Sequence, residues 1–246
     1  MKILVCISKA PDTTTKISFK DNNTKFVEDN VQWIINPYDE WYALVRALEL
    51  KETQGGSVTV INVGLAENEA IIRKALAIGA DDAVRIDAEP ADAYFVAAEI
   101  AAYAKDKNFD LILTGKETIN YNGSEVGGMI AELLDLPYVS LASKLDVAGN
   151  VATMERDIQG GVEVIEVKLP LVISAQKGMA EARIPNMRGI MAARTKPLAV
   201  VSASGSTVLV SVKSYSLPSE KSGCKFFTAD EMDKLVEALH NEAKVI

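Results

Sequence analysis

Apolar and polar positions in the first half of the chain predict strands and helices in alternation. The runs with the character of buried strands are residues 2–8, 57–64, a short strand ending near Ile86, and 110–114. Apolar positions at helical spacing predict helices over residues 36–52, 66–78 and 91–108. Alternation of this kind favours right-handed βαβ units and an α/β fold with a mostly parallel sheet buried on both faces.

The pattern changes after about residue 145. Residues 150–175 predict a hairpin that turns at Gly160-Gly161 and continues into a strand interrupted at Pro170. From residue 197 the chain is rich in serine and predicts an extended arm with little to pack as an independent domain. We therefore expect an α/β domain over residues 1–196 and an arm with a terminal helix over residues 197–246.

The terminal helix is amphipathic. Thr228 and Glu231 have the spacing of a capping box, and the apolar positions of one face are Met232, Leu235, Val236 and Leu239. Such an arm needs a surface to lie against. A partner chain is the preferred interpretation, and packing on the chain's own core is the alternative.

Charge and composition exclude several classes of function. The net charge of -8 argues against binding to nucleic acid or to an anionic membrane. No window approaches the ~20 apolar residues of a membrane span, and the start of the chain does not have the pattern of a signal peptide. Nothing requires an oxidising compartment, since Cys6 lies in an apolar run. We expect a soluble, cytoplasmic, bacterial protein that does not insert into membranes.

Histidine and cysteine are too scarce for much enzyme chemistry. His240 is the one histidine of the sequence, in a charged helical stretch, and the two cysteines, Cys6 and Cys224, are far apart. A histidine-based triad or a metal site is therefore not expected.

Ligands of a parallel sheet bind at the carboxyl ends of its strands, which makes the following loops the candidates. These are residues 8–12, 63–66 and 115–125. Neither a Walker loop nor a GxGxxG fingerprint occurs, so a phosphate would meet backbone N–H groups and a helix N-terminus. The small residues of the third loop fit such a cradle, or only the turn between a strand and a helix.

Several blocks together resemble the β subunit of electron transfer flavoproteins along essentially the whole chain. They are INPYDE at 35–40, AIIRKALAIGADDAVRI at 70–86, TGKETINYNG at 114–123, ERDIQGGVEVIEVKLPLVISA at 155–175, PNMRGIMAARTKPL at 185–198, and the C-terminal HNEAKVI. Met154 and Gln159 depart from the family's usual residues around the fourth block.

The resemblance implies a three-layer fold of the adenine-nucleotide hydrolase type and a heterodimer with a larger α subunit. That α subunit holds the redox-active FAD, and the β subunit binds AMP as a structural nucleotide. The β subunit docks acyl-CoA and related dehydrogenases, and the complex passes electrons to a membrane quinone oxidoreductase. On this interpretation the chain has no catalytic residues, and its arm packs on the α subunit.

The family's AMP site maps onto four segments of this sequence. The matching residues are Cys6, Asn36, Pro37, Tyr38, Asp39, Val63, Gly115, Ile119, Asn120, Asn122, Gly123, Ser124, Glu125 and Val126. Cys6 and Val63 would offer backbone groups and close packing to adenine. Asn36 has an amide suited to adenine or ribose, although a simple turn residue before Pro37 is equally compatible with the sequence.

The phosphate end departs from the family. Ser124, Glu125 and Val126 stand where many members carry Asn-Gln-Thr. An ionised Glu125 would repel a phosphate if it pointed inward and would be harmless pointing outward. We expect the outward orientation, because a backbone anion site does not need the carboxylate inside.

Other family positions concern the flavin and the partners. Tyr38 matches an aromatic ring near the isoalloxazine, or is a core residue at a helix start, and Thr13 replaces a second aromatic. Residues 183–194 match the loop that recognises dehydrogenases, with Met187 as the apolar anchor beside Arg188 and Ile190. Asp157 matches an acidic residue that holds the flavin domain. Met187 as a core residue and Asp157 as a solvated hairpin residue are the alternatives.

Two other functions compete with this interpretation. A bifurcating relative carries a second FAD in its β subunit, takes electrons from NADH and favours D-G-D-T-x-Q-V, of which residues 120–126 keep only the last position. A stand-alone adenine-nucleotide-binding protein would need a Ser-Gly-Gly-x-Asp-Ser loop, which residues 1–20 lack, and would leave the arm unexplained.

Overall fold

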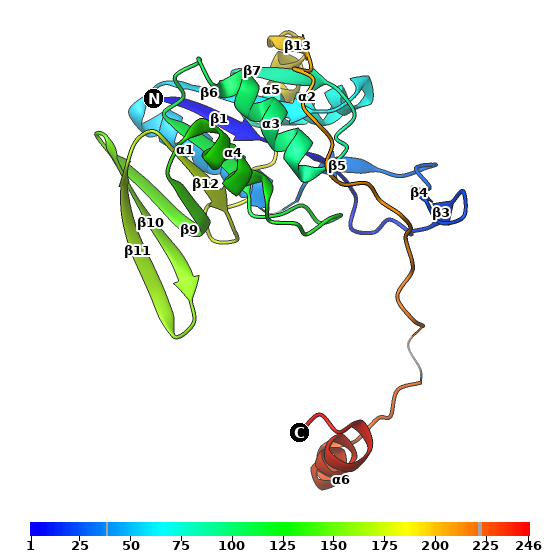
Figure 1. Ribbon diagram of the computed structural model, residues 1–246. Coiled ribbons are helices and arrows are strands. Elements are labelled where there is room, and N and C mark those ends of the chain that lie inside the picture. Colours follow the sequence, from blue (N-terminus) through cyan, green and yellow to red (C-terminus); the bar gives the residue numbers. More distant parts are fainter. Residues whose placement is uncertain (38, 221–222) are drawn as a thin grey trace. The chain divides into compact units, whose positions relative to one another are not determined.

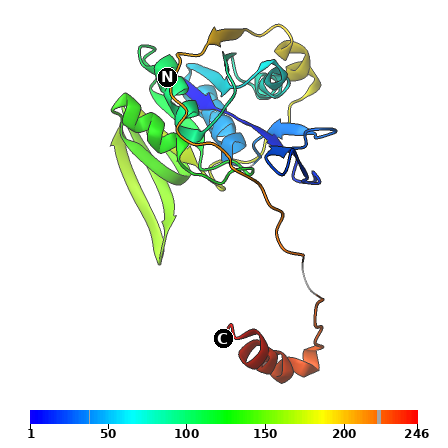
Figure 2. The same ribbon diagram turned by 45° about the vertical axis from the view of Figure 1, so that its right-hand side comes forward.

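The computed structural model describes residues 1–37, 39–220 and 223–246, which fall into two units. The first unit comprises residues 1–17 and 27–213 and contains a large sheet with helices on both faces (Figures 1 and 2). The second comprises residues 18–26 and 214–246. The three-layer α/β fold expected from the sequence is confirmed in the first unit.

Among the described residues, nine strands form one sheet in the order β11-β10-β9-β12-β8-β1-β6-β7-β13. The strands are β1 (Lys2–Cys6), β6 (Ser57–Val63), β7 (Asp82–Asp87), β8 (Leu111–Gly115), β9 (Tyr138–Ala148), β10 (Val151–Ile158), β11 (Gly161–Lys168), β12 (Leu171–Ala175) and β13 (Leu198–Ser202). All neighbouring pairs are parallel except β9 with β10 and β10 with β11. The mostly parallel sheet follows from the helices that cross over between its strands.

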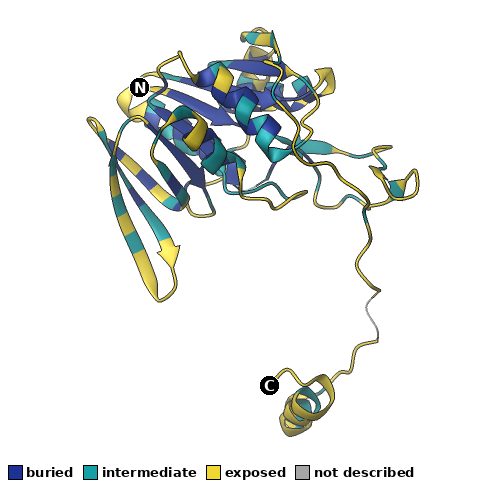
Figure 3. Ribbon diagram, viewed as in Figure 1, coloured by how far each residue is buried: buried dark blue, intermediate teal, exposed yellow. Residues whose placement is uncertain are grey.

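The helices cover both faces of the sheet. They are α1 (Asp39–Gln54), α2 (Glu69–Ile78), α3 (Ala93–Ala104), α4 (Val126–Leu134) and α5 (Met187–Ala193). Residues of α1 and α2 pack with Ile3 and Val5 of β1 on one face, and residues of α3 and α4 pack with Leu4 and Cys6 on the other. Side chains of a strand alternate between faces, so the central strand is buried on both (Figure 3).

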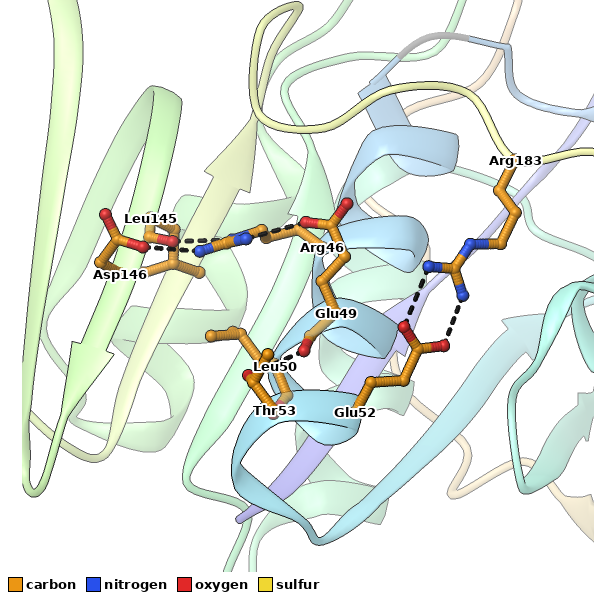
Figure 4. A network of polar contacts seen from close by, with 8 residues as sticks. All are labelled: Arg46, Glu49, Leu50, Glu52, Thr53, Leu145, Asp146 and Arg183. Carbon is orange, nitrogen blue, oxygen red and sulfur yellow. Dashed lines mark hydrogen bonds and ion pairs between the residues drawn. The ribbon is translucent and has the colours of Figure 1, made fainter.

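The hairpin expected over residues 150–175 is present, as β10 and β11 with β12 after the break at Pro170. The sequence did not predict β9, which joins the hairpin to the parallel strands. Arg46 of α1 holds β9 in place: its guanidinium donates to the Leu145 carbonyl at 2.7 Å and pairs with Asp146 at 2.7 Å (Figure 4). Met154 lies in the core of this region, fully buried.

Two segments differ from the sequence interpretation. Residues 198–202 were assigned to the arm, whereas they form β13, which pairs with β7 and extends the sheet. Residues 183–194 were expected to form a loop, whereas α5 occupies part of them. Short strands that the sequence did not predict also occur: β2 (Lys9–Pro11) pairs with β5 (Trp33–Ile35).

The second unit holds a small hairpin and the C-terminal helix. Strands β3 (Phe19–Lys20) and β4 (Lys25–Phe26) pair, and the ring of Phe19 stacks on Tyr215 with centroids 4.8 Å apart. Helix α6 (Met232–Glu237) follows a 3₁₀ turn whose capping box of Thr228 and Glu231 is confirmed. The helix buries none of its residues.

Candidate functional site

The candidate site lies where the direction of strand order reverses. From β1 the chain adds β6 and β7 on one side, and it then returns to place β8 on the other side. The carboxyl ends of β1 and β8, at Cys6 and Gly115, therefore flank a switch point, where open α/β sheets bind ligands. The start of α1 and the loop before α4 adjoin this edge.

Cys6 and Val63 are packed beneath the switch point on the α3 and α4 face of the sheet. Their exposed fractions are 6% and 5%. Burial, together with the nearby charge of Glu40, raises the pKa of the Cys6 thiol far above its usual range. Cys6 is therefore a neutral, small apolar side chain, as the packing role assigned to it from the sequence requires.

Asn36 connects the start of α1 to the loop after β8. Its side-chain amide donates to the Glu117 carbonyl at 2.9 Å and accepts from the Ile119 N–H at 2.9 Å. Its own N–H donates to the Ser8 carbonyl at 3.2 Å. The fully buried amide thus shapes the loop, a role that neither sequence interpretation included. Direct contact of Asn36 with a ligand stays a prediction.

Glu40 ties the loop after β1 to the first turn of α1. Its carboxylate accepts from the Ser8 N–H and from the Ser8 hydroxyl, each at 2.7 Å. Gly115 lies against it: a Cβ there would stand 2.8 Å from Glu40 Cγ and 3.0 Å from Glu40 N. Only glycine allows β8 to end this close to α1.

Two buried acids set the charge at this edge. Burial raises the pKa of Glu40 to about 8, against the hydrogen bonds from Ser8 that lower it. Burial also raises the pKa of Asp39 to about 6, with Lys116 acting in the opposite direction and Glu117 in the same one. At pH 7 Glu40 is mostly protonated and Asp39 mostly ionised. The edge therefore carries less negative charge than its carboxyl count implies.

The loop before α4 is held in a tight conformation. The Asn122 N–H donates to the Thr118 carbonyl at 2.8 Å, and Asn122 and Ser124 have left-handed φ angles of 50° and 55°. Gly127 brings the first turn of α4 against β8, since a Cβ would stand 2.8 Å from Thr114 Oγ1. At Gly128 the nearest atom would be 3.5 Å away, so packing requires only the first glycine of the pair.

The N-terminus of α4 is not capped by the side chain of its N-cap residue. Glu125 is the N-cap residue, is exposed, and makes no side-chain hydrogen bond to the helix. Ser124 is also exposed, and its hydroxyl is 3.3 Å from a carboxylate oxygen of Glu117. No cap bond from Glu125 therefore competes with an anion for the first N–H groups of α4. Tyr38 lies outside the described residues, and Thr13 is exposed.

A second candidate surface is formed by α5. The exposed fractions are 73% for Met187, 40% for Ile190 and 56% for Met191, and Arg188 is exposed as well. The side chain of Asn186 caps the helix by accepting from the Gly189 N–H at 2.8 Å. Apolar side chains exposed together on a short helix are typical of a contact surface for another protein.

The α5 surface is fixed to the body of the protein at both ends. Before it, Arg183 forms a two-contact ion pair with Glu52 of α1, at 2.6 and 3.1 Å (Figure 4). After it, Arg73 of α2 donates to the carbonyls of Ala193 and Lys196 at 2.8 and 2.7 Å. In the middle, a Cβ on Gly189 would stand 2.3 Å from the Ala77 carbonyl oxygen. Helix α5 therefore rests directly on the backbone of α2.

Comparisons with known proteins identify the family. The model of the electron transfer flavoprotein domain matches residues 23–206. Over all of both chains, the sequence is 38% identical to the electron transfer flavoprotein subunit beta of Bacillus subtilis. The subunit beta of Syntrophomonas wolfei is also 38% identical, over 100% of this chain and 98% of that one. For the human subunit beta the identity is 33%, over 82% and 81% of the two chains.

The chain belongs to the electron transfer flavoprotein β-subunit family. The resemblance inferred from the sequence blocks is thereby confirmed. The structure places the family-derived site residues in three places: the switch-point edge, the α5 surface, and the hairpin, where Asp157 is exposed and accepts a 3.4 Å hydrogen bond from Gln176. Among the described residues, no helix has the length and apolar character to cross a membrane.

Sequence reasoning missed one residue of the switch-point edge in this family member, Glu40, whereas its partner Ser8 and the loop residue Glu117 lie in the loops predicted as candidates. Glu40 left one signal, an acid in the first turn of a helix within INPYDE, but that position usually indicates a solvated residue that favours the helix dipole. Its burial becomes visible only when β1 and β8 are placed beside α1.

Proposed function

We propose that the chain is the β subunit of a heterodimeric electron transfer flavoprotein, an electron carrier with no catalytic residues of its own. It accepts electrons from flavin dehydrogenases of the acyl-CoA dehydrogenase type and passes them towards a quinone oxidoreductase. FAD, held mainly by the larger α subunit, supplies the redox chemistry. The family membership supports the carrier role, and the cytoplasm is the proposed location.

The switch-point edge carries the proposal of a structural AMP. Its α4 N-terminus and the backbone of residues 115–125 suit a phosphate, and Cys6 with Val63 offers a small apolar floor for adenine. Protonation of Glu40 limits the negative charge beside the phosphate. The switch-point edge offers backbone groups, glycines and apolar packing. These groups favour binding of a nucleotide that is not chemically changed.

The arm supports the proposal of an obligate α-subunit partner. Met232 and Val236 of α6 are 47% and 55% exposed, and α6 buries none of its residues. A large partner surface offers the burial that this helix lacks within its own unit. The α5 surface is proposed to dock dehydrogenases through Met187, with Arg188 and Ile190 beside it, and Asp157 is proposed to hold the flavin domain.

Nucleotide extraction from the complex tests the function. The chain is produced with its larger subunit, the yellow complex is purified, and FAD and AMP are released and quantified by chromatography. One FAD and one AMP per heterodimer is the expected content. Two FAD together with reduction of the flavin by NADH would replace the proposal with the bifurcating type, and a nucleotide-loaded chain without a partner subunit would indicate a stand-alone binding protein.

A further inference from the structure

Two carboxylates of α3 hold the root of the arm by its backbone. Glu99, which is 2% exposed, accepts from the Ser204 N–H at 2.6 Å, from the Ser204 hydroxyl at 2.8 Å and from the Ser206 N–H at 2.9 Å. All these contacts lie within the first unit, directly after β13.

Gly205 makes the double contact with Glu99 possible. Its φ of +89° is a left-handed conformation that other residues adopt at a cost. It turns the chain so that the N–H groups on either side of it reach one carboxylate. No atom lies within 4 Å of the position of a Cβ there, so the glycine is required by backbone conformation and not by space.

Asp92 provides a second contact point at the start of the same helix. One oxygen caps α3 by accepting from the Phe95 N–H at 2.6 Å. The other accepts from the Leu209 N–H at 2.6 Å and the Val210 N–H at 2.7 Å. The arm root thus runs antiparallel to α3, with Ser204 at the second turn and Val210 at the N-terminus.

Both acids are ionised in this arrangement. The N–H groups of Phe95, Val210 and Leu209 hold the pKa of Asp92 below its usual range. Burial acts to raise the pKa of Glu99, but the hydrogen bonds from Ser204 and Ser206 outweigh it and the net direction is downward. Hydrogen bonds to charged acceptors are stronger than those between neutral groups.

The backbone contacts leave the side chains of the arm root directed outward. Val208, Leu209 and Val210 are 47%, 63% and 67% exposed. A segment that packed on its own domain would bury these apolar side chains and leave its backbone N–H groups to bond with water. Here the backbone polar groups face α3 and the apolar side chains remain exposed, at the root of the arm that the proposed function assigns to the larger subunit.

We propose that Asp92 and Glu99 are positioning residues for subunit assembly, which fix residues 204–210 on α3 so that Val208, Leu209 and Val210 are presented to the larger subunit. This inference rests on the proposed function, since the partner that would cover these three apolar side chains is the α subunit. Fixing the root before association removes part of the ordering entropy from the binding step, so the anchored form binds more tightly than a free arm.

The test compares the dissociation of purified heterodimers on dilution. Glu99→Gln places an N–H₂ group among the arm's donors, and Gly205→Ala strains the same contact from the arm side without touching α3. Each is expected to raise the dissociation constant by about tenfold, the scale of one lost charge-assisted contact. Hydrogen exchange in the complex should show loss of protection at the amides of Ser204 and Ser206, which donate to Glu99. Because both act on one contact, the double variant should be little worse than either single one.

Glu132→Gln is the matched control, an exposed acid on α4, and is expected to leave the dissociation constant unchanged. Variants that lose protection at Ser204 and Ser206 but dissociate like the parent would overturn the assembly role. Equal protection in parent and variants would overturn the anchor itself. Failure of the parent chain to form any complex with the larger subunit would instead count against the proposed function. Self-association of the chain through Val208, Leu209 and Val210 would show that a second copy, and not the larger subunit, covers these side chains.

Discussion

The carboxylate of Glu40 receives both hydrogen bonds that Ser8 can donate, from its N–H and from its hydroxyl, each at 2.7 Å. This pair closes the switch-point edge between β1 and α1, and Gly115 of β8 packs directly on it. The pair thus connects three elements that are far apart in sequence. Its acid is also the group whose pKa of about 8 departs furthest from an ordinary carboxyl among those that face the edge.

Glu40→Gln is expected to flatten the pH dependence of stability. The folded-state pKa of Glu40, about 8, is above the ordinary value of 4.5, so between these values the folded state binds more protons than the unfolded state. The free energy of unfolding therefore falls as the pH rises through this range. Urea unfolding at a series of pH values should show this slope in the parent, a weaker slope in Glu40→Gln, and the parent's slope in Glu132→Gln.

Gly127→Ala is expected to reduce AMP retention, whereas Gly128→Ala should retain it. The added Cβ at Gly127 stands 2.8 Å from Thr114 Oγ1 and 3.1 Å from the Tyr138 ring, so the first turn of α4 must move. At Gly128 the contact of 3.5 Å is ordinary, and alanine favours the helix by up to about 1 kcal/mol. AMP content after gel filtration is the measurement. Equal AMP content in the two variants would contradict the placement of the phosphate at this helix start.

Glu125→Gln is expected to change the affinity for AMP by less than about threefold, because an exposed charge is screened by solvent and salt. The exposed side chain makes no cap bond to α4. Titration of AMP-depleted complex with AMP at low and at physiological ionic strength measures the effect. A gain of tenfold or more would show that the carboxylate faces the phosphate.

Met187→Ala is expected to slow electron acceptance from a dehydrogenase by about tenfold while the FAD content stays unchanged, in line with the loss of an interfacial anchor. Met187 is 73% exposed on α5. Leu133→Ala is the control, an apolar residue of α4 that is 43% exposed. Reduction of the flavin by substrate-loaded dehydrogenase is followed by absorbance. Loss of FAD in the methionine variant would argue against a docking role.

Gly189→Ala is expected to reproduce the defect of Met187→Ala without altering any exposed side chain. A Cβ at residue 189 would stand 2.3 Å from the Ala77 carbonyl oxygen, and α5 must therefore shift away from α2. The same reduction assay applies, with FAD content and thermal unfolding as accompanying measurements. Parent-like kinetics would show that the position of α5 on α2 does not matter for docking.

The pattern of apolar and polar positions was sufficient to predict the strands of the parallel half of the sheet. The apolar runs that form β1, β6 and β8 are flanked by helical patterns. A short, continuous apolar run between helices is typical of a strand in a parallel sheet that helices cover on both faces. It failed at β9 and β13. The segment 198–202 is short and is followed by serines. It forms a strand because it pairs with the free edge of β7. This pairing is a feature of the tertiary structure, which a local sequence pattern does not contain.

The candidate site was found from the sequence only as far as its loops. The rule that ligands bind at the carboxyl ends of parallel strands selected residues 8–12, 63–66 and 115–125, and the family resemblance added Cys6 and Asn36. The amide hydrogen bonds of Asn36 join residues 81 and 83 positions apart. The burial of Glu40 depends on the close fit of Gly115. Such contacts follow from tertiary packing, and residue type and spacing alone do not determine that packing.

Strand β13 also bears on the order of events during synthesis. It is the last strand of the large sheet in chain order, and it completes the edge beside β7. On the ribosome, this edge stays open until residues 198–202 have emerged. The arm root, its anchor on α3 and the terminal helix follow only after that. A nascent chain therefore completes its large sheet before it displays the arm that is proposed to bind the larger subunit.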